Sequence, residues 1–108
     1  MLPKNRRIPK DQFPILKNGK VFQNDLFILK VSQYKDQSRF CFSVSKKINK
    51  NAVIRNKMRR LGYQNLAKHL PIIKPGIIAC FYFKMKPKNK EEVDQKLFEI
   101  LKESNLIK

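Results

Sequence analysis

Half of this chain carries positive charge with no acidic residue to balance it. Between Asp36 and Glu91 there is no aspartate or glutamate, whereas fourteen lysines and arginines occur there. A compact domain with such a surface repels itself, so its folded state calls for an anionic partner. Lysine and arginine pair with phosphate, and a nucleic acid backbone supplies phosphate in quantity. The sequence therefore predicts a protein that binds a polyanion.

Length and composition restrict the remaining possibilities. With 108 residues and a hydrophobic fraction of 42%, the chain has room for one core. Its formal net charge of +17 exceeds what solubility requires. The sequence shows neither a secretory signal pattern nor an apolar run long enough to span a membrane, which predicts a cytoplasmic protein. Cys41 and Cys80 lie in separate apolar runs, which favours buried, reduced thiols over the alternative of a disulfide.

The N-terminal part of the chain predicts a basic arm followed by a short helix. Residues 1–10 are rich in lysine and arginine and contain two prolines, so we expect an extended arm. Asp11 has the position of a helix cap, and Gly19 that of a stop, for a helix reaching about Asn18. Together with the remainder of the chain, these segments are expected to form a single domain over residues 1–108.

Three segments have the character of β-strands. Residues 26–32 form a nearly continuous apolar run, as expected of a strand covered on both faces. Residues 39–45 alternate between large apolar and small side chains, so the face with the small polar ones can remain open to a ligand. Residues 77–83 are strongly β-prone and predict a central strand.

Two helices are predicted in the second half of the chain. A long helix from Ala52 to about Leu70 has one side for the core and one for a polyanion. Its inward side comprises Ile54, Met58, Leu61 and Asn65, and its outward side Arg55, Asn56, Arg59, Arg60 and Tyr63. A last helix opens at Asn89, which has capping-box spacing to Glu92. Its predicted core residues are Val93, Leu97, Ile100 and Leu101.

The order of these segments predicts the fold class. It is α+β, a small single-domain two-layer sandwich in the order α-β-β-β-α-β-α, in which two or three strands precede the long helix and two of them have assigned residues. Five of the eight acidic residues belong to the last helix or its first turn. Because acid is thus segregated to one element, we expect that helix to face away from a bound nucleic acid.

Residues able to perform catalysis are sparse. His69 is the only histidine, and its place beside Lys68 near a helix end is typical of a solvated surface group. A nuclease that binds Mg²⁺ needs clustered carboxylates, whereas the acids outside the last helix are scattered. The three glycines stand alone, so no glycine-rich phosphate loop is present. We therefore expect no catalytic residues and no metal ligands in the chain itself.

The middle of the chain carries a long basic motif. Residues 42–47 read Phe-Ser-Val-Ser-Lys-Lys, and residues 51–61 read Asn-Ala-Val-Ile-Arg-Asn-Lys-Met-Arg-Arg-Leu. This motif resembles the protein subunit of bacterial ribonuclease P, in which a Ser-Val-Ser-Lys-Lys strand end precedes a helix opening with Asn-Ala-Val-x-Arg-Asn-Arg-x-Lys-Arg. The upstream Arg6-Arg7 and the downstream apolar strand follow in the same order, so the resemblance spans essentially the whole chain.

The resemblance implies a function and a topology. Members of this family bind the catalytic RNA of ribonuclease P, and together they remove the 5′ leader of precursor tRNA. The chemistry belongs to the RNA and to Mg²⁺, which is bound mainly by the RNA subunit and the substrate. The implied partners are therefore ribonuclease P RNA and precursor tRNA, with no membrane and no required protein partner. A left-handed βαβ crossover through the long helix is also implied, where general rules predict a right-handed one.

The resemblance also implies two sets of binding residues. The RNA-binding set is Arg6, Arg7, Lys46, Lys47, Asn51, Arg55, Asn56, Lys57, Arg59 and Arg60. The set for a cleft that holds the single-stranded leader is Phe13, Lys30, Ser43 and Ser45. Aromatic stacking and small polar contacts suit unpaired RNA without strict base choice.

The chain departs from the family pattern at several positions. Lys57 replaces the second arginine of the motif, which keeps the charge but loses the bidentate fork. Tyr63 replaces a further basic residue, and Lys30 stands where a strand-face aromatic is common. We expect RNA binding to survive these changes. The sequence does not predict which bases the protein prefers in the leader.

Three other functions compete with this interpretation. A ribosomal or other structural RNA-binding protein has similar size and charge, and the strand-to-helix motif is what argues against it. A DNA-binding module is disfavoured because the basic helix is anchored to the core and no helix-turn-helix or dimerising heptad is visible. A membrane-surface protein is also disfavoured, because it would need an amphipathic helix with a free apolar face, and the sequence predicts none.

Overall fold

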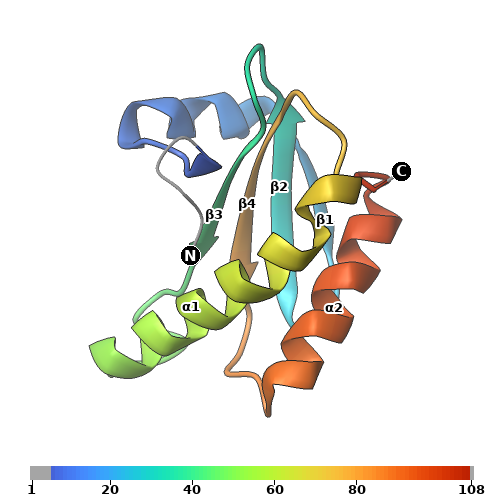
Figure 1. The fold of residues 1–108 in the computed structure, drawn as a ribbon. Coiled ribbons are helices and arrows are strands. Elements are labelled where there is room, and N and C mark those ends of the chain that lie inside the picture. The colour runs from blue at the N-terminus through green and yellow to red at the C-terminus, as the bar shows by residue number, and fades with distance from the viewer. Residues whose placement is uncertain (1–5, 108) are drawn as a thin grey trace.

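Four strands of the chain pair into one sheet, and two α-helices cover one of its faces (Figure 1). The computed structural model describes residues 6–107, so the part of the predicted arm formed by residues 1–5 lies outside the described residues. The elements are the 3₁₀ helix η2 (Lys10–Asn18), β1 (Lys20–Gln23), β2 (Phe27–Gln33), β3 (Arg39–Ser43), α1 (Ala52–His69), the 3₁₀ turn η3 (Leu70–Ile72), β4 (Ile77–Phe83) and α2 (Lys90–Glu103). The predicted α+β two-layer class is confirmed.

The strand order in the sheet is β1-β2-β4-β3. β1 pairs with β2 and β2 with β4 in antiparallel fashion, whereas β3 and β4 are parallel. β4 is therefore a central strand, as its apolar run predicts. Because β3 and β4 are parallel neighbours, the chain must cross over between them, and α1 makes that crossover. The left-handed sense of the crossover stays a prediction from the family resemblance.

The main core lies between the sheet and the two α-helices. Its centre is aromatic: the rings of Phe42 and Phe81 stack with centroids 4.8 Å apart, and Phe27 meets both rings edge-on. α2 contributes all four of its predicted core residues, Val93, Leu97, Ile100 and Leu101, each with 0% of its surface exposed. The periodicity of α2 was thus sufficient to identify its buried side.

The prediction that the strand near residues 26–32 is covered on both faces is wrong. In β2 the side chains alternate, with Leu29 buried and Lys30 exposed. The α-helices pack on only one face of the sheet, and η2 covers only part of the other. Sequence reasoning also assigned no residues to β1, which has only four residues and alternates little in polarity.

The first helix differs in type from the one predicted. η2 is a 3₁₀ helix that follows Pro9, and no side chain caps it, so Asp11 is not its cap. Pro14 lies inside the helix and has no N–H to donate to the preceding turn. Gly19 ends η2 as predicted. The position admits no larger residue, because a Cβ there would lie 2.4 Å from the carbonyl oxygen of Val31.

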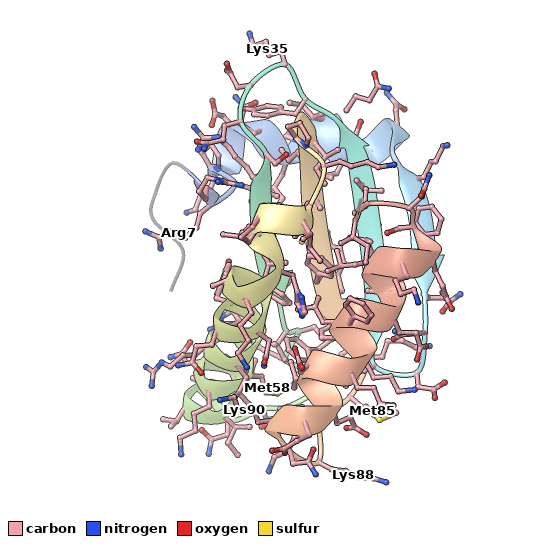
Figure 2. All side chains as sticks on the ribbon, turned by 45° about the vertical axis from the view of Figure 1, so that its right-hand side comes forward. Arg7, Lys35, Met58, Met85, Lys88 and Lys90 are labelled. Carbon is pink, nitrogen blue, oxygen red and sulfur yellow. The ribbon has the colours of Figure 1, made fainter. Side chains whose placement is uncertain are left out.

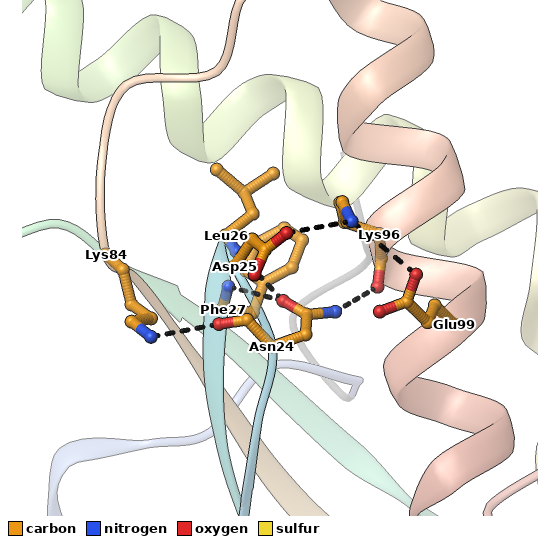
Figure 3. A network of polar contacts seen from close by, with 7 residues as sticks. All are labelled: Asn24, Asp25, Leu26, Phe27, Lys84, Lys96 and Glu99. Atoms are coloured by element: carbon orange, nitrogen blue, oxygen red, sulfur yellow. Dashed lines mark hydrogen bonds and ion pairs between the residues drawn. The ribbon is translucent and has the colours of Figure 1, made fainter.

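A polar network fixes the turn between β1 and β2 to α2 (Figure 3). The Oδ1 atom of Asn24 accepts from the backbone N–H groups of Leu26 and Phe27, and its Nδ2 donates to the carbonyl oxygen of Lys96. Lys96 in turn pairs with Asp25 at 3.3 Å. Lys84 donates to the carbonyl oxygen of Asn24 at 3.0 Å. Two of the many lysines therefore have a structural role in this network.

Candidate nucleic-acid interface

The start of α1 concentrates positive charge. Asn51 caps the helix, since its Oδ1 accepts from the N–H groups of Val53 and Ile54. The first turn contains no acidic residue, although acids are favoured there by the helix dipole. Unpaired N–H groups and the dipole make a helix N-terminus attractive to anions. The predicted RNA-binding residue Asn51 thus has a structural role, and it places this positive helix end.

Arg55 organises the loop that precedes α1. Its guanidinium donates to the carbonyl oxygens of Asn49 and Lys50 at 2.9 and 3.0 Å. The backbone N–H of Asn51 also donates to the Oδ1 of Asn49. The turn of residues 49–50 is therefore closed by Arg55, which keeps further N–H donors beyond those two bonds.

The other predicted residues near α1 are largely free to meet a ligand. We call Lys46, Lys47, Asn56, Lys57, Arg59 and Arg60 the motif surface. Arg59 donates to the Oδ1 of Asn56, which holds these two side chains together. Lys46, Lys47, Lys57 and Arg60 are exposed, and within residues 6–107 no hydrogen bond or ion pair engages their side chains. Such cations can neutralise phosphates without first breaking another interaction.

The face of the sheet opposite the α-helices is partly open. Strand register sets its residues in rows: Ile28, Tyr82 and Ser43 lie side by side across β2, β4 and β3. The adjacent row is Lys30, Cys80 and Cys41. Three of the four predicted leader-cleft residues, Lys30, Ser43 and Ser45, line one groove on this face, with a volume of about 570 Å³. We call it the sheet groove.

Tyr82 lines the sheet groove together with Phe83, and sequence reasoning missed it. Its ring lies in the lining beside Ser43, and the Nζ of Lys30 stands 5.5 Å from the ring centroid. Lys30 therefore accompanies an aromatic surface rather than replacing it. The alternation of side chains along residues 77–83 could have identified it. Tyr82 shares a face of the strand with Cys80, whereas Phe81 points into the core on the other face.

Phe13 does not line the sheet groove. From η2 it packs against a small cluster that includes Ile8, Leu16 and Cys80. Tyr82 packs against the same cluster. Phe13 and the groove therefore share one face of the sheet, with the cluster between them. The structure thus separates this predicted residue from the other three.

Arg6 and Arg7 lie along the edge strand β3. The N–H of Ile8 donates to the carbonyl oxygen of Phe40, and Arg7 forms a parallel bridge with Phe40. The Nε of Arg6 donates to the carbonyl oxygen of Ser38 at 2.9 Å. These arginines flank the beginning of β3, whereas Lys46 and Lys47 follow its end, so the strand separates the two groups. Arg7 lies at the outer edge of the molecule (Figure 2).

Two residues placed on the solvated surface by sequence reasoning are held by other parts of the fold: Tyr63 is buried and His69 is half-buried. Tyr63 was assigned to the polyanion side of α1, yet only 7% of it is exposed, and its hydroxyl accepts from the N–H of Phe42. Burial raises the pKa of Tyr63 to about 12. His69 is not a solvated group either, because its Nε2 lies 3.1 Å from the Oδ1 of Asp94 and joins α1 to α2. Helical phase alone could not show how close the neighbouring elements come.

Cys41 and Cys80 are opposite each other on β3 and β4. Both are free thiols, with Cys80 buried and Cys41 half-buried. The hydrogen bond with Cys80 lowers the pKa of Cys41 to about 7, and Tyr63 and Arg59 act in the same direction against the effect of burial. The bond to Cys41, together with burial, raises the pKa of Cys80. Cys41 is therefore the thiol of this pair that ionises first.

Neither a membrane-spanning helix nor a metal-binding cluster occurs among the residues that the structure describes. Among the helices within residues 6–107, none is long and apolar enough to cross a membrane. In the same range, no three His, Cys, Asp or Glu side chains gather into a group that could hold a metal ion.

Known proteins resemble this chain over most of its length. A family model described as Ribonuclease P matches residues 2–105. The ribonuclease P protein component of Rippkaea orientalis (strain PCC 8801 / RF-1) is 30% identical over 83 residues, which cover 69% of this chain. The chain spans 65% of the length of that relative.

Solved structures show the same fold. A mutant of the Staphylococcus aureus RNase P protein with defective mRNA degradation activity superposes with a TM-score of 0.86 at 29% identity, covering 96% of this chain and 92% of that one. The RNase P protein from Thermotoga maritima superposes with a TM-score of 0.79 at 25% identity, covering 90% of this chain and 96% of that one.

Proposed function

The chain belongs to the ribonuclease P protein family, and from this membership we propose that it is the protein component of a ribonuclease P holoenzyme. It binds the catalytic RNA subunit and the 5′ leader of precursor tRNA, and it assists the endonucleolytic removal of that leader. The chemistry is carried out by the RNA. The motif surface meets RNA phosphates, and the sheet groove holds the unpaired leader.

One observation carries this proposal: the sheet groove and the motif surface are continuous at the end of β3. Ser43 and Ser45 line the groove, and Lys46 and Lys47 follow directly in the chain. A single strand in the groove therefore leaves it beside cations that pair with a structured RNA. The apolar and aromatic lining around Tyr82 suits base stacking, which accepts any sequence.

Mg²⁺ enters this function through the RNA. The motif surface offers ammonium and guanidinium cations and a single amide oxygen, that of Asn56, which accepts from Arg59. This set does not make the carboxylate-bearing oxygen site that Mg²⁺ prefers. We propose that Mg²⁺ is held by phosphates of the RNA subunit and the substrate. By neutralising neighbouring phosphates, the protein lowers the Mg²⁺ concentration that the RNA needs.

Precursor-tRNA cleavage by a bacterial ribonuclease P RNA at low Mg²⁺, with and without the protein, tests the proposal. We expect the protein to stimulate cleavage and to have no activity alone. Tight, salt-sensitive RNA binding without stimulation, after a cognate RNA has been tried, would instead support a ribosomal or other structural RNA-binding role.

The motif surface has a test of its own in the salt dependence of binding. Arg60→Ala removes one exposed cation of α1, so the slope of log affinity against log salt should fall by about one. Lys102→Ala is the matched control, because Lys102 is exposed on α2 and lies 5.6 Å over the ring of Phe98. Equal slopes for wild type and Arg60→Ala would remove Arg60 from the interface.

A further inference from the structure

A second groove lies on the other side of α1, away from the sheet groove. It is formed by α1 and by the connector of residues 84–89 that joins β4 to α2, and its volume is about 320 Å³. Its lining is Ile54, Lys57, Met58, Leu61, Lys86 and Pro87. We call it the connector groove. Figure 2 shows Met58 at the same end of the molecule as Lys88 and Lys90.

The phase of α1 separates two residues of the motif surface, and only Lys57 lines the connector groove. Lys57 and Arg59 are two residues apart, so their side chains point about 200° apart around the helix. The charge of Arg59 lowers the pKa of Cys41 on β3, whereas Lys57 lines the connector groove. Lys57 therefore belongs to a different contact from the one that Arg59 makes.

The connector brings a series of lysines that the proposed function has not used. Lys84, Lys86, Lys88 and Lys90 alternate along it. Lys84 is tied to Gln23 and Asn24. The other three are exposed, and no hydrogen bond or ion pair engages their side chains within the described residues. Of these three, only Lys86 lines the connector groove.

We propose that the connector groove binds one unpaired nucleotide of the RNA held by the motif surface. Its base rests on the apolar floor formed by Ile54, Met58 and Leu61, and its phosphates lie between Lys57 and Lys86. This inference rests on the proposed function, because it extends the same RNA interface across α1.

Charge and shape together favour this occupant. The two lysines come from different elements and flank an apolar floor, which matches the arrangement of a nucleotide with an apolar face between charged phosphates. Glu92, in the first turn of α2, accepts from the backbone N–H of Lys88 and so is engaged locally. An unpaired base can leave its stack and offer its face to a protein, whereas a base inside a duplex cannot.

The first test compares two neighbouring lysines of the connector. Lys86→Ala should weaken binding of a bacterial ribonuclease P RNA several-fold and lower the salt slope by about one. Lys88→Ala removes the same charge two residues away but outside the groove, and should change affinity much less. Equal losses of affinity for the two variants would mean that the lysines act only through their general electrostatic field, which would overturn the proposal. No loss of affinity for Lys86→Ala would overturn it as well.

The second test separates the base from the phosphates. The probes are a single-stranded oligouridylate and inorganic polyphosphate, which carries negative charge without bases. Ile54→Ala should weaken binding of the oligouridylate while leaving polyphosphate binding unchanged. Val53→Ala is the control, because Val53 is 61% exposed and does not line the groove. Equal effects of Ile54→Ala on both probes, or none on either, would contradict a base on the apolar floor.

Failure of this inference is distinguishable from failure of the proposed function. If wild-type protein stimulates cleavage by ribonuclease P RNA while Lys86→Ala behaves as Lys88→Ala does, the connector groove is excluded and the function stands. If wild-type protein does not stimulate the RNA, the function fails. In that case the oligouridylate and polyphosphate measurements still decide whether the groove binds a nucleotide.

Discussion

At the scale of single residues, register decides which side chains can act together. Tyr82, Ser43 and Ile28 are far apart in sequence but lie in one row across three strands. Lys30 then stands over the Tyr82 ring, which combines a cation with a stacking surface. This pairing is suited to a nucleotide, because a phosphate and a base can be bound at one place.

Replacing the Tyr82 ring tests its role. Tyr82→Leu keeps an apolar side chain but removes the stacking surface, so affinity for precursor tRNA should fall by about 1–3 kcal/mol. Affinity for mature tRNA, which has no leader, should change little. Binding of both RNAs to the reconstituted holoenzyme measures the difference, and Tyr34→Leu serves as the control because Tyr34 does not line the groove. Equal losses for the two RNAs would exclude a leader contact.

The thiol of Cys41 predicts a pH dependence. Because its pKa is lowered to about 7, the thiolate should already predominate just above neutral pH. Alkylation of Cys41 should therefore rise through about pH 7 rather than through about pH 8.5, the ordinary value for cysteine. Cys80 is buried and should stay unmodified.

Mass spectrometry after timed alkylation measures both sites. The matched variant is Cys80→Ala, which removes the hydrogen bond that lowers the pKa of Cys41 and should move the midpoint upward. A Cys41 profile centred on the ordinary value in the wild-type protein would show that Cys80 does not lower the pKa of Cys41.

At the scale of elements, α1 has to satisfy the core and the RNA at once. Its basic end is unfavourable for an isolated helix, because cations are repelled by the positive end of the dipole. The Asn51 cap and the close packing against β3 offset this cost. The contact is tight at Gly62, where a Cβ would lie 2.4 Å from a ring carbon of Phe42.

Gly62→Ala should therefore destabilise the protein, although alanine favours a helix by about 1 kcal/mol over glycine. The Phe42 ring cannot yield readily, since it stacks on Phe81 and meets Tyr63 edge-on. Overpacking of this kind costs about 1–3 kcal/mol in the free energy of unfolding. Urea unfolding measures the loss, with Gln64→Ala on the exposed side of α1 as the control. A more stable Gly62→Ala variant would show that α1 can move away from β3.

At the scale of the whole molecule, acidic residues tend to be paired with bases near α2, whereas many of the described basic residues have no acidic partner. Several of the few acids are engaged near α2: Asp94 with His69, and Asp25 and Glu99 with Lys96. The cations of the motif surface and the connector have no such partners within residues 6–107. The surface where RNA is proposed to bind therefore carries positive charge that no acid balances locally.

This arrangement predicts that salt stabilises the protein without RNA. Added NaCl screens the repulsion between cations, with a Debye length of about 10 Å at 0.1 M. The urea midpoint should therefore rise with NaCl while the slope of the unfolding free energy against urea stays constant. A midpoint that falls with salt would mean that the ion pairs of α2 outweigh the repulsion.

Much of this architecture was predictable because it depends on local pattern. The alternation in β3, the cap at Asn89 and the four core residues of α2 each follow from neighbours within a few positions. The errors arose where a distant segment decides the outcome. The 3₁₀ form of η2, the open face of β2 and the burial of Tyr63 depend on elements that the local pattern does not describe.

The sequence by itself determined the class of fold, the excess of positive charge and the motif that places the chain in its family. Charge and periodicity are properties of the order of residues, so they need no coordinates. Only the tertiary structure decided that Tyr82 joins Lys30 and Ser43, that Phe13 stands apart from them, and that Lys57 faces Lys86. Strand register and helix packing fix those neighbours, because they bring together side chains separated by tens of residues.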